Sequence, residues 1–360
     1  LDGCFKNLFR CYEILLSYKD TQNLYIILLL SSIGIILGVI FIIFNHWNSS
    51  KNSFNMGIIS QEYSNNSFKD LKLKNNKLNF KSSNFNKFDF SNDWFYEWLI
   101  GFTDGDGTFT IDRQKNGTKW NLVYKVSQKS NNFKILYFIK HKLSYGNITK
   151  SNDNNWCFRI RDKKVLNNVI FPIFDKFPLV TIKYYDYEIV KKAYLILTDE
   201  SLDKNTRNKL KEDLYNLLKK GPDNNYLSPV WNDSNYLLSK PWVIGFWEAE
   251  GSFYIVKKEE NRLCHGFGIT QKFDKKILFQ LSKIFHTSSK VRYNKKGFFS
   301  LDSTGHRANL NIVNYFYDEK INYFIGIKSL QFTIWRRTLK FRGQYIKLLR
   351  IRELLRALLN

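Results

Sequence analysis

The sequence has 360 residues, enough for two domains of ordinary size, and 44% of them are hydrophobic, so a buried core is expected. Lys and Arg number 56 against 32 Asp and Glu. The formal charge of +24 favours a polyanionic partner, with nucleic acid ahead of an anionic membrane surface. The four cysteines form no CxxC pair and the five histidines form no HExxH motif, which argues against zinc knuckles, disulfide frameworks and histidine–metal nucleases.

The first feature along the chain is an uncharged apolar run at 24–44. Its 21 residues, LYIILLLSSIGIILGVIFIIF, are enough to cross a bilayer as a helix. No small-residue cleavage site follows this run, so a signal peptide is the weaker alternative. We therefore expect an N-terminal segment, 1–47, that contains a transmembrane helix at 24–44 and binds a membrane unless processing removes it.

After the apolar run comes a segment whose composition predicts a disordered tether, and beyond this segment the chain repeats itself. Residues 48–92 are rich in Asn, Ser and Lys and show no steady hydrophobic period. Then WLIGFTDGDGTF at 98–109 returns as WVIGFWEAEGSF at 242–253, each followed by two strand patterns and a helix pattern. The duplication predicts a first repeat at 93–220, a linker at 221–240, and a second repeat at 241–360 with a basic C-terminal helix.

Polar residues recur at matching offsets in the two repeats. A glutamine ends the second strand pattern 22 or 21 residues after the last acid of the motif, and a lysine opens a later helix pattern 77 or 78 residues after it. This recurrence distinguishes these residues from ordinary solvated surface. They are Asp106, Gln128 and Lys183 in the first repeat and Glu250, Gln271 and Lys328 in the second.

Each motif predicts a helix with one face of small residues. These residues, four apart in each motif, are Gly101 and Gly105 in the first and Gly245 and Ala249 in the second. Such faces would let the two helix backbones approach closely, so the helices would end together at Asp106 and Glu250. A glycine follows each acid, and we expect Gly107 and Gly251 to adopt the left-handed conformation that stops a helix.

Two carboxylates at meeting helix ends would oppose the helix dipoles and repel each other. A divalent cation makes the arrangement favourable, because Mg²⁺, or Mn²⁺ as the alternative, prefers hard oxygen ligands. We expect Asp106 and Glu250 to bind this metal, with the carbonyl oxygens of Gly105 and Ala249 as further ligands. On a basic protein the site indicates phosphodiester hydrolysis, in which the glutamines orient water and the lysines neutralise charge on the phosphate.

The strand patterns predict a sheet face that contacts DNA. Basic and polar side chains alternate with apolar ones, and an antiparallel sheet can lie along the major groove. The candidates for nucleic-acid contacts are Lys125, Ser127, Arg159 and Arg161 in the first repeat and Lys275, Arg292, Ser300 and Asp302 in the second.

The segments LIGFTDGDG at 99–107 and VIGFWEAEG at 243–251 resemble the two signature motifs of single-chain LAGLIDADG homing endonucleases and group I intron maturases. The resemblance implies an α+β fold of two pseudo-symmetric αββαββα repeats with saddle-shaped antiparallel sheets, and it matches Asp106 and Glu250 to the metal-binding acids. The second motif has Glu where the name-giving pattern has Asp. Asn132 stands where the family has a basic residue, a position that Lys275 fills in the second repeat.

The resemblance implies a site-specific endonuclease for double-stranded DNA, acting as a monomer, whose breaks with short 3′ overhangs promote intron mobility. The alternative is an RNA maturase that assists splicing of its own group I intron; this role needs neither acid, and both activities can coexist. Heavy use of Lys, Asn, Ile, Phe and Tyr is typical of an AT-rich organelle genome. We expect an intron-encoded mitochondrial protein, tethered to the inner membrane if residues 1–47 are retained.

Overall fold

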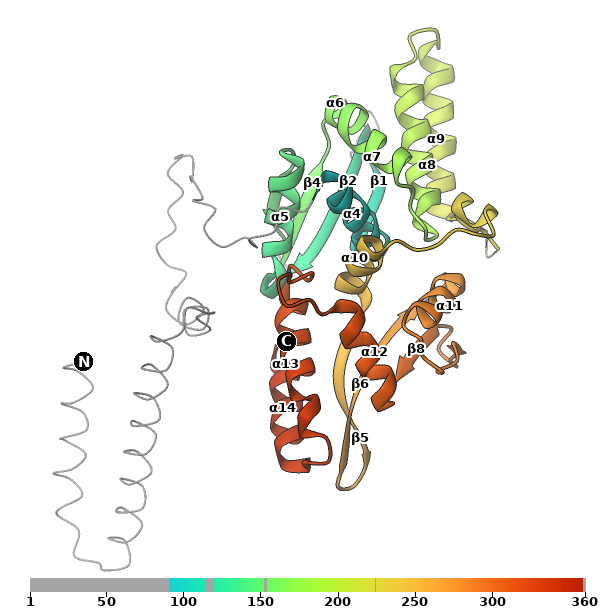
Figure 1. The fold of residues 1–360 in the computed structure, drawn as a ribbon. Coiled ribbons are helices and arrows are strands. Elements are labelled where there is room, and N and C mark those ends of the chain that lie inside the picture. Colours follow the sequence, from blue (N-terminus) through green and yellow to red (C-terminus); the bar gives the residue numbers. More distant parts are fainter. Residues whose placement is uncertain (1–90, 114–119, 152–153, 224, 359–360) are drawn as a thin grey trace, which may run out of the picture. The chain divides into compact units, whose positions relative to one another are not determined.

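The computed structural model of the chain describes residues 91–113, 120–151, 154–223 and 225–358, all within one compact unit, Ser82–Asn360 (Figure 1). The expected transmembrane helix at 24–44 and nearly all of the expected tether at 48–92 lie outside these residues. Among the helices that are described, none combines the length and the apolar character that a bilayer crossing needs.

The first repeat begins with helix α4 (Asn92–Asp106), labelled as in Figure 1. Its start lies one residue before the expected boundary at 93, because the Ser91 hydroxyl accepts a hydrogen bond from the Trp94 amide at 3.2 Å. The chain continues through β1 (Gly107–Arg113), β2 (Trp120–Lys129), the 3₁₀ turn η1 (Ser130–Asn132), α5 (Lys134–Leu143), β3 (Asn147–Lys150) and β4 (Asn155–Ile160). It closes with α6 (Lys163–Val165), the π-helical turn η2 (Leu166–Ile170), α7 (Phe171–Lys176), α8 (Lys183–Thr198) and α9 (Lys204–Lys220).

The second repeat follows the same order after a connection that contains the 3₁₀ turn η3 (Pro229–Asn232). Ser239 caps its first helix by accepting from the Trp242 amide at 3.3 Å. The elements are α10 (Lys240–Glu250), β5 (Ser252–Glu259), β6 (Arg262–Gln271), α11 (Lys275–Ile284), β7 (Arg292–Tyr293), β8 (Phe299–Ser303), α12 (His306–Phe316), α13 (Ile327–Thr338), the 3₁₀ turn η4 (Leu339–Phe341) and α14 (Tyr345–Ala357).

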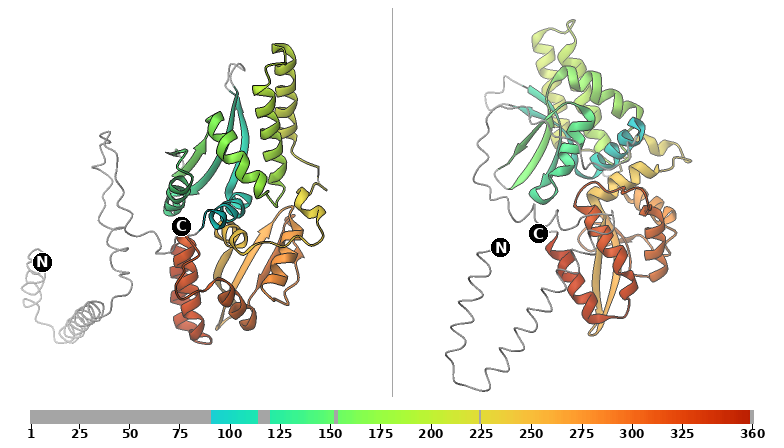
Figure 2. Two further views of the ribbon diagram at one scale, coloured as in Figure 1. Left: turned by 45° about the horizontal axis from the view of Figure 1, so that its top comes forward. Right: turned by 60° about the vertical axis from the view of Figure 1, so that its left-hand side comes forward.

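Each repeat contains one four-stranded antiparallel sheet, in the order β1-β2-β4-β3 or β5-β6-β8-β7. The predicted α+β fold with antiparallel sheets is therefore confirmed. In the first sheet Tyr124 pairs with Ile160 and Val126 with Phe158, and all four side chains are buried against the helices. The views in Figures 1 and 2 place the two sheets to either side of the α4–α10 pair.

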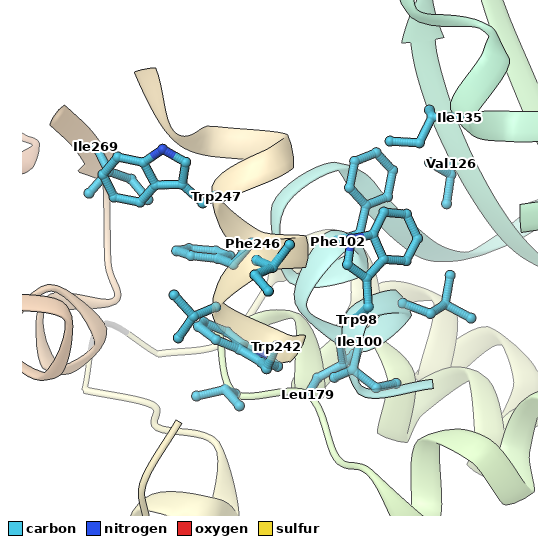
Figure 3. Packing of buried hydrophobic residues seen from close by; sticks show 14 of the residues in the cluster. Trp98, Ile100, Phe102, Val126, Ile135, Leu179, Trp242, Phe246, Trp247 and Ile269 are labelled. Carbon is cyan, nitrogen blue, oxygen red and sulfur yellow. The ribbon is translucent and has the colours of Figure 1, made fainter. Parts of the chain in front are cut away.

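The contact between α4 and α10 leaves no room for side chains at its centre. A Cβ atom on Gly101 would lie 2.1 Å from the Trp242 carbonyl oxygen, and one on Gly245 would lie 2.0 Å from the Trp98 carbonyl oxygen. Aromatic side chains from both helices surround this contact, among them Trp98 and Phe102 from α4 and Trp242 and Phe246 from α10 (Figure 3). The predicted packing through small residues is what the structure contains.

The prediction that the glycines after the two motif helices adopt the left-handed conformation is wrong. Gly107 and Gly251 have φ angles of −83° and −70°, which is extended backbone rather than the left-handed conformation. Glycine is required at these two positions for a steric reason. The strand begins directly after the helix, and the last helical turn leaves no room for a Cβ atom. A Cβ atom on Gly107 would lie 2.4 Å from a Thr103 methyl carbon, and one on Gly251 would lie 2.4 Å from the Trp247 indole.

Gly105→Ala tests the helix contact. Its new Cβ atom would lie 2.3 Å from the Ala249 Cβ atom, so we expect the free energy of unfolding, measured in urea, to fall by about 1–3 kcal/mol. Adding Ala249→Gly removes the clashing atom and leaves the summed helix propensity of the pair unchanged. The double variant should recover most of the loss; a double variant as unstable as Gly105→Ala would contradict this account.

Candidate active site

The last residues of α4 and α10, Asp106 and Glu250, are brought together by the close packing of the two helices. Both side chains are partly buried. Burial raises the pKa of Asp106, while burial and then the negative charge of Asp106 raise the pKa of Glu250. The two carboxylates are therefore close enough for one charge to disfavour the other, as the sequence predicts for this pair.

Each of these carboxylates is hydrogen-bonded to the glutamine at the end of a central strand. Gln128, near the end of β2, donates from Nε2 to Asp106 Oδ2 at 2.6 Å, and Gln271, the last residue of β6, is bonded to Glu250. Both hydrogen bonds favour the ionised carboxylate and oppose the rise in its pKa. The glutamines thus hold the acids in fixed orientations.

The two predicted lysines lie at the starts of α8 and α13 and reach the ends of the motif helices. Lys183 donates to the carbonyl oxygens of Thr103, at 3.2 Å, and of Gly105, and Lys328 donates to the carbonyl oxygen of Gly251. Burial lowers the pKa of both ammonium groups, and the surrounding carboxylates oppose this shift. All six residues with matching offsets therefore gather at one place.

The oxygen atoms at the helix ends suit a hard divalent cation. The carbonyl oxygen of Gly105 accepts a hydrogen bond from the ammonium group of Lys183. This end of α4 therefore already binds one positively charged group, a lysine of the same chain. Burial raises the pKa values of Asp106 and Glu250 although Lys183 and Lys328 oppose the rise, so a bound cation would further favour both ionised carboxylates. Ala249 occupies the position before Glu250 that Gly105 occupies before Asp106. These residues fit Mg²⁺ or Mn²⁺.

The first acid of the first motif has a role that the sequence analysis missed. Asp104 is 2% exposed, and its carboxylate accepts from the amides of Val180 and Thr181, both at 3.0 Å, and from the Trp242 indole at 2.8 Å. The Thr181 hydroxyl donates to it as well, at 2.5 Å. Since Val180 and Thr181 lie two to three residues before Lys183, Asp104 anchors the segment that carries the lysine.

Glu248 has the equivalent role in the second motif. It accepts from the amides of Ile325 at 2.7 Å and Gly326 at 3.1 Å, just before Lys328, and burial raises its pKa to about 7. A sequence signal existed, because each motif carries an acid two residues before its last acid, Asp104 in the first and Glu248 in the second. It was easily overlooked, since the shared partners are main-chain amides.

The predicted DNA-contact residues of the first repeat share the sheet face that points away from the helices. Lys125 on β2 pairs with Arg159 on β4, and Ser127 lies two residues further along the same face of β2. Arg161 follows β4 and binds Asp112 of β1 at 3.0 Å. Ser127 and Arg161 are exposed, and Lys125 and Arg159 are partly exposed.

In the second repeat, three of the four predicted DNA-contact residues share a sheet face. Arg292 on β7 pairs with Ser300 on β8, and its guanidinium binds Asp302 Oδ1 at 2.5 Å. Lys275 is instead the first residue of α11, where its ammonium lies 5.5 Å from the centre of the Phe299 ring at the start of β8. It lies beside the sheet face rather than on it.

Comparison with known families agrees with this geometry. Residues 99–194 and 243–339 each match the family described as LAGLIDADG endonuclease, and together they make up more than half of the chain. The chain belongs to the LAGLIDADG endonuclease family. Each matched range of this LAGLIDADG protein runs from a motif helix, through one sheet, to the helix that carries the lysine.

Two fungal relatives of this LAGLIDADG protein differ in how much of their length it covers. The "Probable intron-encoded endonuclease Cox1-I1b" of Schizosaccharomyces pombe is 42% identical over 291 residues, which are 78% of this chain and 72% of the relative. The "Uncharacterized mitochondrial protein RF1" of Saccharomyces cerevisiae is 33% identical over 221 residues, which are 60% of this chain and 43% of the relative.

Solved structures of LAGLIDADG proteins share the fold. The structure described as I-SmaMI bound to uncleaved DNA target in the presence of calcium ions has a TM-score of 0.61 and 22% identity, and the match covers 73% of this chain and 97% of that chain. The LAGLIDADG homing endonuclease I-GzeII in complex with its DNA target has a TM-score of 0.59 and 22% identity, with 72% and 97% covered.

Asp104→Asn and Asp106→Asn should affect stability differently, although each removes one charge. Both oxygens of Asp104 accept from N–H donors, so an amide NH₂ would meet another donor, and we expect the free energy of unfolding to fall by about 1–3 kcal/mol. Asp106→Asn keeps an oxygen for Gln128 and removes a poorly compensated charge, so stability should stay constant or rise. Urea unfolding in EDTA measures both; equal losses would contradict the division of roles.

Proposed function

We propose that this LAGLIDADG protein is a metal-dependent, site-specific endonuclease that cuts both strands of a DNA target. The observation that carries the proposal is the meeting of Asp106 and Glu250 at the ends of helices from different repeats. A duplex has twofold-related strands, so a duplicated site offers one acid for each scissile phosphate. The name of the Schizosaccharomyces pombe relative, a probable intron-encoded endonuclease, supports the proposal.

Asp106 and Glu250, with the carbonyl oxygens of Gly105 and Ala249, would hold Mg²⁺ or Mn²⁺. When bound, the metal would supply an activated water and stabilise the leaving 3′ oxygen. The hydrogen bonds from Gln128 and Gln271 keep the carboxylates from rotating out of the site. Lys183 and Lys328 bring positive charge to a partly buried place, where attraction for a phosphate is screened less than in open water.

The outer faces of the two sheets support duplex DNA as the substrate. We propose that together they form a saddle on the DNA, in which Lys125, Arg159 and Ser300 contact phosphates and base edges in the major groove. In the free protein, Arg161 and Arg292 are paired with aspartates on the same face. Those exposed pairs are weak and would open readily when DNA competes for the arginines.

Further parts of the proposal concern the setting of the enzyme. We propose that the chain acts as a monomer, that its breaks carry 3′ overhangs and promote intron mobility, and that it is mitochondrial. The name of the Saccharomyces cerevisiae relative, a mitochondrial protein, supports the location, although this chain covers only 43% of it. Tethering to the inner membrane would depend on residues 24–44, which lie outside the described residues.

A second candidate function, splicing of its own group I intron RNA, is supported by the charge of the last two helices. Residues 327–358 contain nine Lys and Arg against one acid, whereas the equivalent residues 183–220 contain nine against seven. The ring of Trp335 on α13 lies 5.1 Å from that of Phe253, on the buried face of the second sheet. The basic α13–α14 surface is therefore on the opposite side from Arg292 and could bind a separate polyanion.

Cleavage of a duplex that carries the ligated exons flanking the intron tests the first function. In Mg²⁺ the full-length protein should cut both strands, and Asp106→Asn with Glu250→Gln should lower the rate by about 100-fold or more, because metal ligands are lost. DNA binding in EDTA, measured by gel shift, should persist. Asp213→Asn, which removes a charge on the exposed surface of α9, is the matched control and should cut normally. Binding of this duplex without cleavage in Mg²⁺ or Mn²⁺ would contradict the proposal.

Arg350→Glu with Arg356→Glu tests the second function. These exposed residues of α14 should contribute to binding of the intron RNA, so affinity at 0.1 M salt should fall by about tenfold or more, with a shallower salt dependence. Lys204→Glu with Lys209→Glu makes the same charge change on α9 and should leave RNA affinity nearly unchanged. Equal losses in both variants, or displacement of the RNA by target duplex, would argue against a separate RNA surface.

A further inference from the structure

We propose that Asn132 and Asp274 are positioning residues, each of which holds the active-site lysine of the opposite repeat. The inference rests on the proposed endonuclease function. Asn132 lies four residues after Gln128 and shortly before α5, and Asp274 lies three residues after Gln271 and directly before α11. Neither helix start receives a side-chain cap, so neither residue serves its own helix in the usual way of Asn and Asp.

Asp274 reaches from the second repeat into the first. Its Oδ1 atom accepts a hydrogen bond at 3.0 Å from the amide of Ile182, which is 92 residues away in sequence. Ile182 directly precedes Lys183. The carboxylate that would ordinarily cap α11 therefore fixes the main chain beside the lysine of the other repeat.

Asn132 makes the matching contact in the opposite direction. Its Oδ1 atom accepts from the amide of Ile327 at 2.8 Å, across 195 residues of sequence, and Ile327 directly precedes Lys328. Its Nδ2 atom donates to Gln128 Oε1 at 2.6 Å, and Gln128 in turn donates to Asp106. A continuous path of hydrogen bonds thus joins the metal-binding acid of one repeat to the lysine segment of the other.

Each lysine segment is consequently held by two acceptors of different origin, one from the motif helix of its own repeat and one from the opposite repeat. In the second repeat they converge on Gly326, where a Cβ atom would lie 2.1 Å from Asn132 Oδ1 and 3.1 Å from Glu248 Oε1. Loss of the opposite-repeat acceptor would leave the lysine attached but free to shift. A misplacement of about 1 Å can lower a rate about 100-fold, so each repeat sets the geometry of the other's cleavage site.

Amide hydrogen exchange of the full-length protein tests this anchoring without relying on cleavage. In Asp274→Leu, peptides that cover 180–186 should exchange about tenfold faster, which corresponds to the net loss of about one hydrogen bond, while those that cover 325–331 keep their rates. In Asn132→Leu the pattern should be reversed. Faster exchange confined to the substituted repeat, or equal in both segments, would overturn the proposal.

Asp203→Leu is the matched control for the exchange experiment. Asp203 accepts from the amides of Asn205 and Thr206 at the start of α9, so its loss removes the same kind of carboxylate–amide contact. Exchange should rise at that helix start and at neither lysine segment. A rise at 180–186 in this control would show general loosening instead of a specific anchor and would count against the proposal.

Strand-resolved cleavage tests the consequence for the reaction. Lys183→Met and Lys328→Met first establish which DNA strand each lysine serves. Asp274→Leu should then slow the strand that Lys183→Met slows, by about 10- to 100-fold, and Asp274→Asn, which keeps an acceptor oxygen, should restore most of the rate. Slowing of the Lys328 strand instead, or no rescue by Asp274→Asn, would overturn the proposal. If the unaltered protein cuts neither strand, the endonuclease function fails, and the exchange experiment still decides the anchoring.

Discussion

The structure depends on direct contact between the backbones of α4 and α10. Gly101 and Gly245 each lie against a carbonyl oxygen of the partner helix, so the helices approach more closely than any side chain would permit. This approach is what brings the ends of the helices, and therefore Asp106 and Glu250, to one point. The same contact unites the cores of the two repeats, since Trp98 and Phe102 extend to one side of it and Trp247 to the other (Figure 3).

The close approach of the two helices has an electrostatic cost, because it buries charged side chains, and the surrounding residues offset part of this cost. Burial raises the pKa values of Asp106 and Glu250, the charge of Asp106 raises that of Glu250 further, and burial lowers the pKa values of the two lysines. Each charge is restrained by a neighbour: glutamines hold the acids, and main-chain carbonyls receive the lysines. Asp104 and Glu248, the first acids of the two motifs, favour the charged forms of Lys183 and Lys328 and also determine where these lysines stand. Each motif therefore contains one acid that we propose binds the metal and one acid that anchors the backbone before the lysine.

The sequence was sufficient to predict those site residues whose side-chain types recur at nearly equal offsets in both repeats. Asp106, Gln128 and Lys183 have counterparts at nearly equal offsets, so chance was a poor explanation, and the structure gathers all six residues. The conformation of Gly107 was predicted wrongly because glycine is required for two physical reasons, a positive φ or a lack of room, and a sequence does not separate them. The roles of Asp104 and Asn132 were not predicted, because their partners are main-chain amides brought near only by the tertiary fold.

The contacts between opposite repeats limit how this chain can be recombined with other LAGLIDADG proteins. Asn132 packs against the backbone at Gly326, where there is no room for a side chain, whereas Asp274 bonds to the Ile182 amide beside Thr181. The two contact sites are therefore not interchangeable. A chimera that joined the first half of this chain to the second half of another LAGLIDADG protein would place a foreign residue at one of these contact sites, the Ile182 amide. The residue and the backbone segment that it holds would have to be transplanted together, because each lysine is positioned partly by a residue encoded in the other half of the gene.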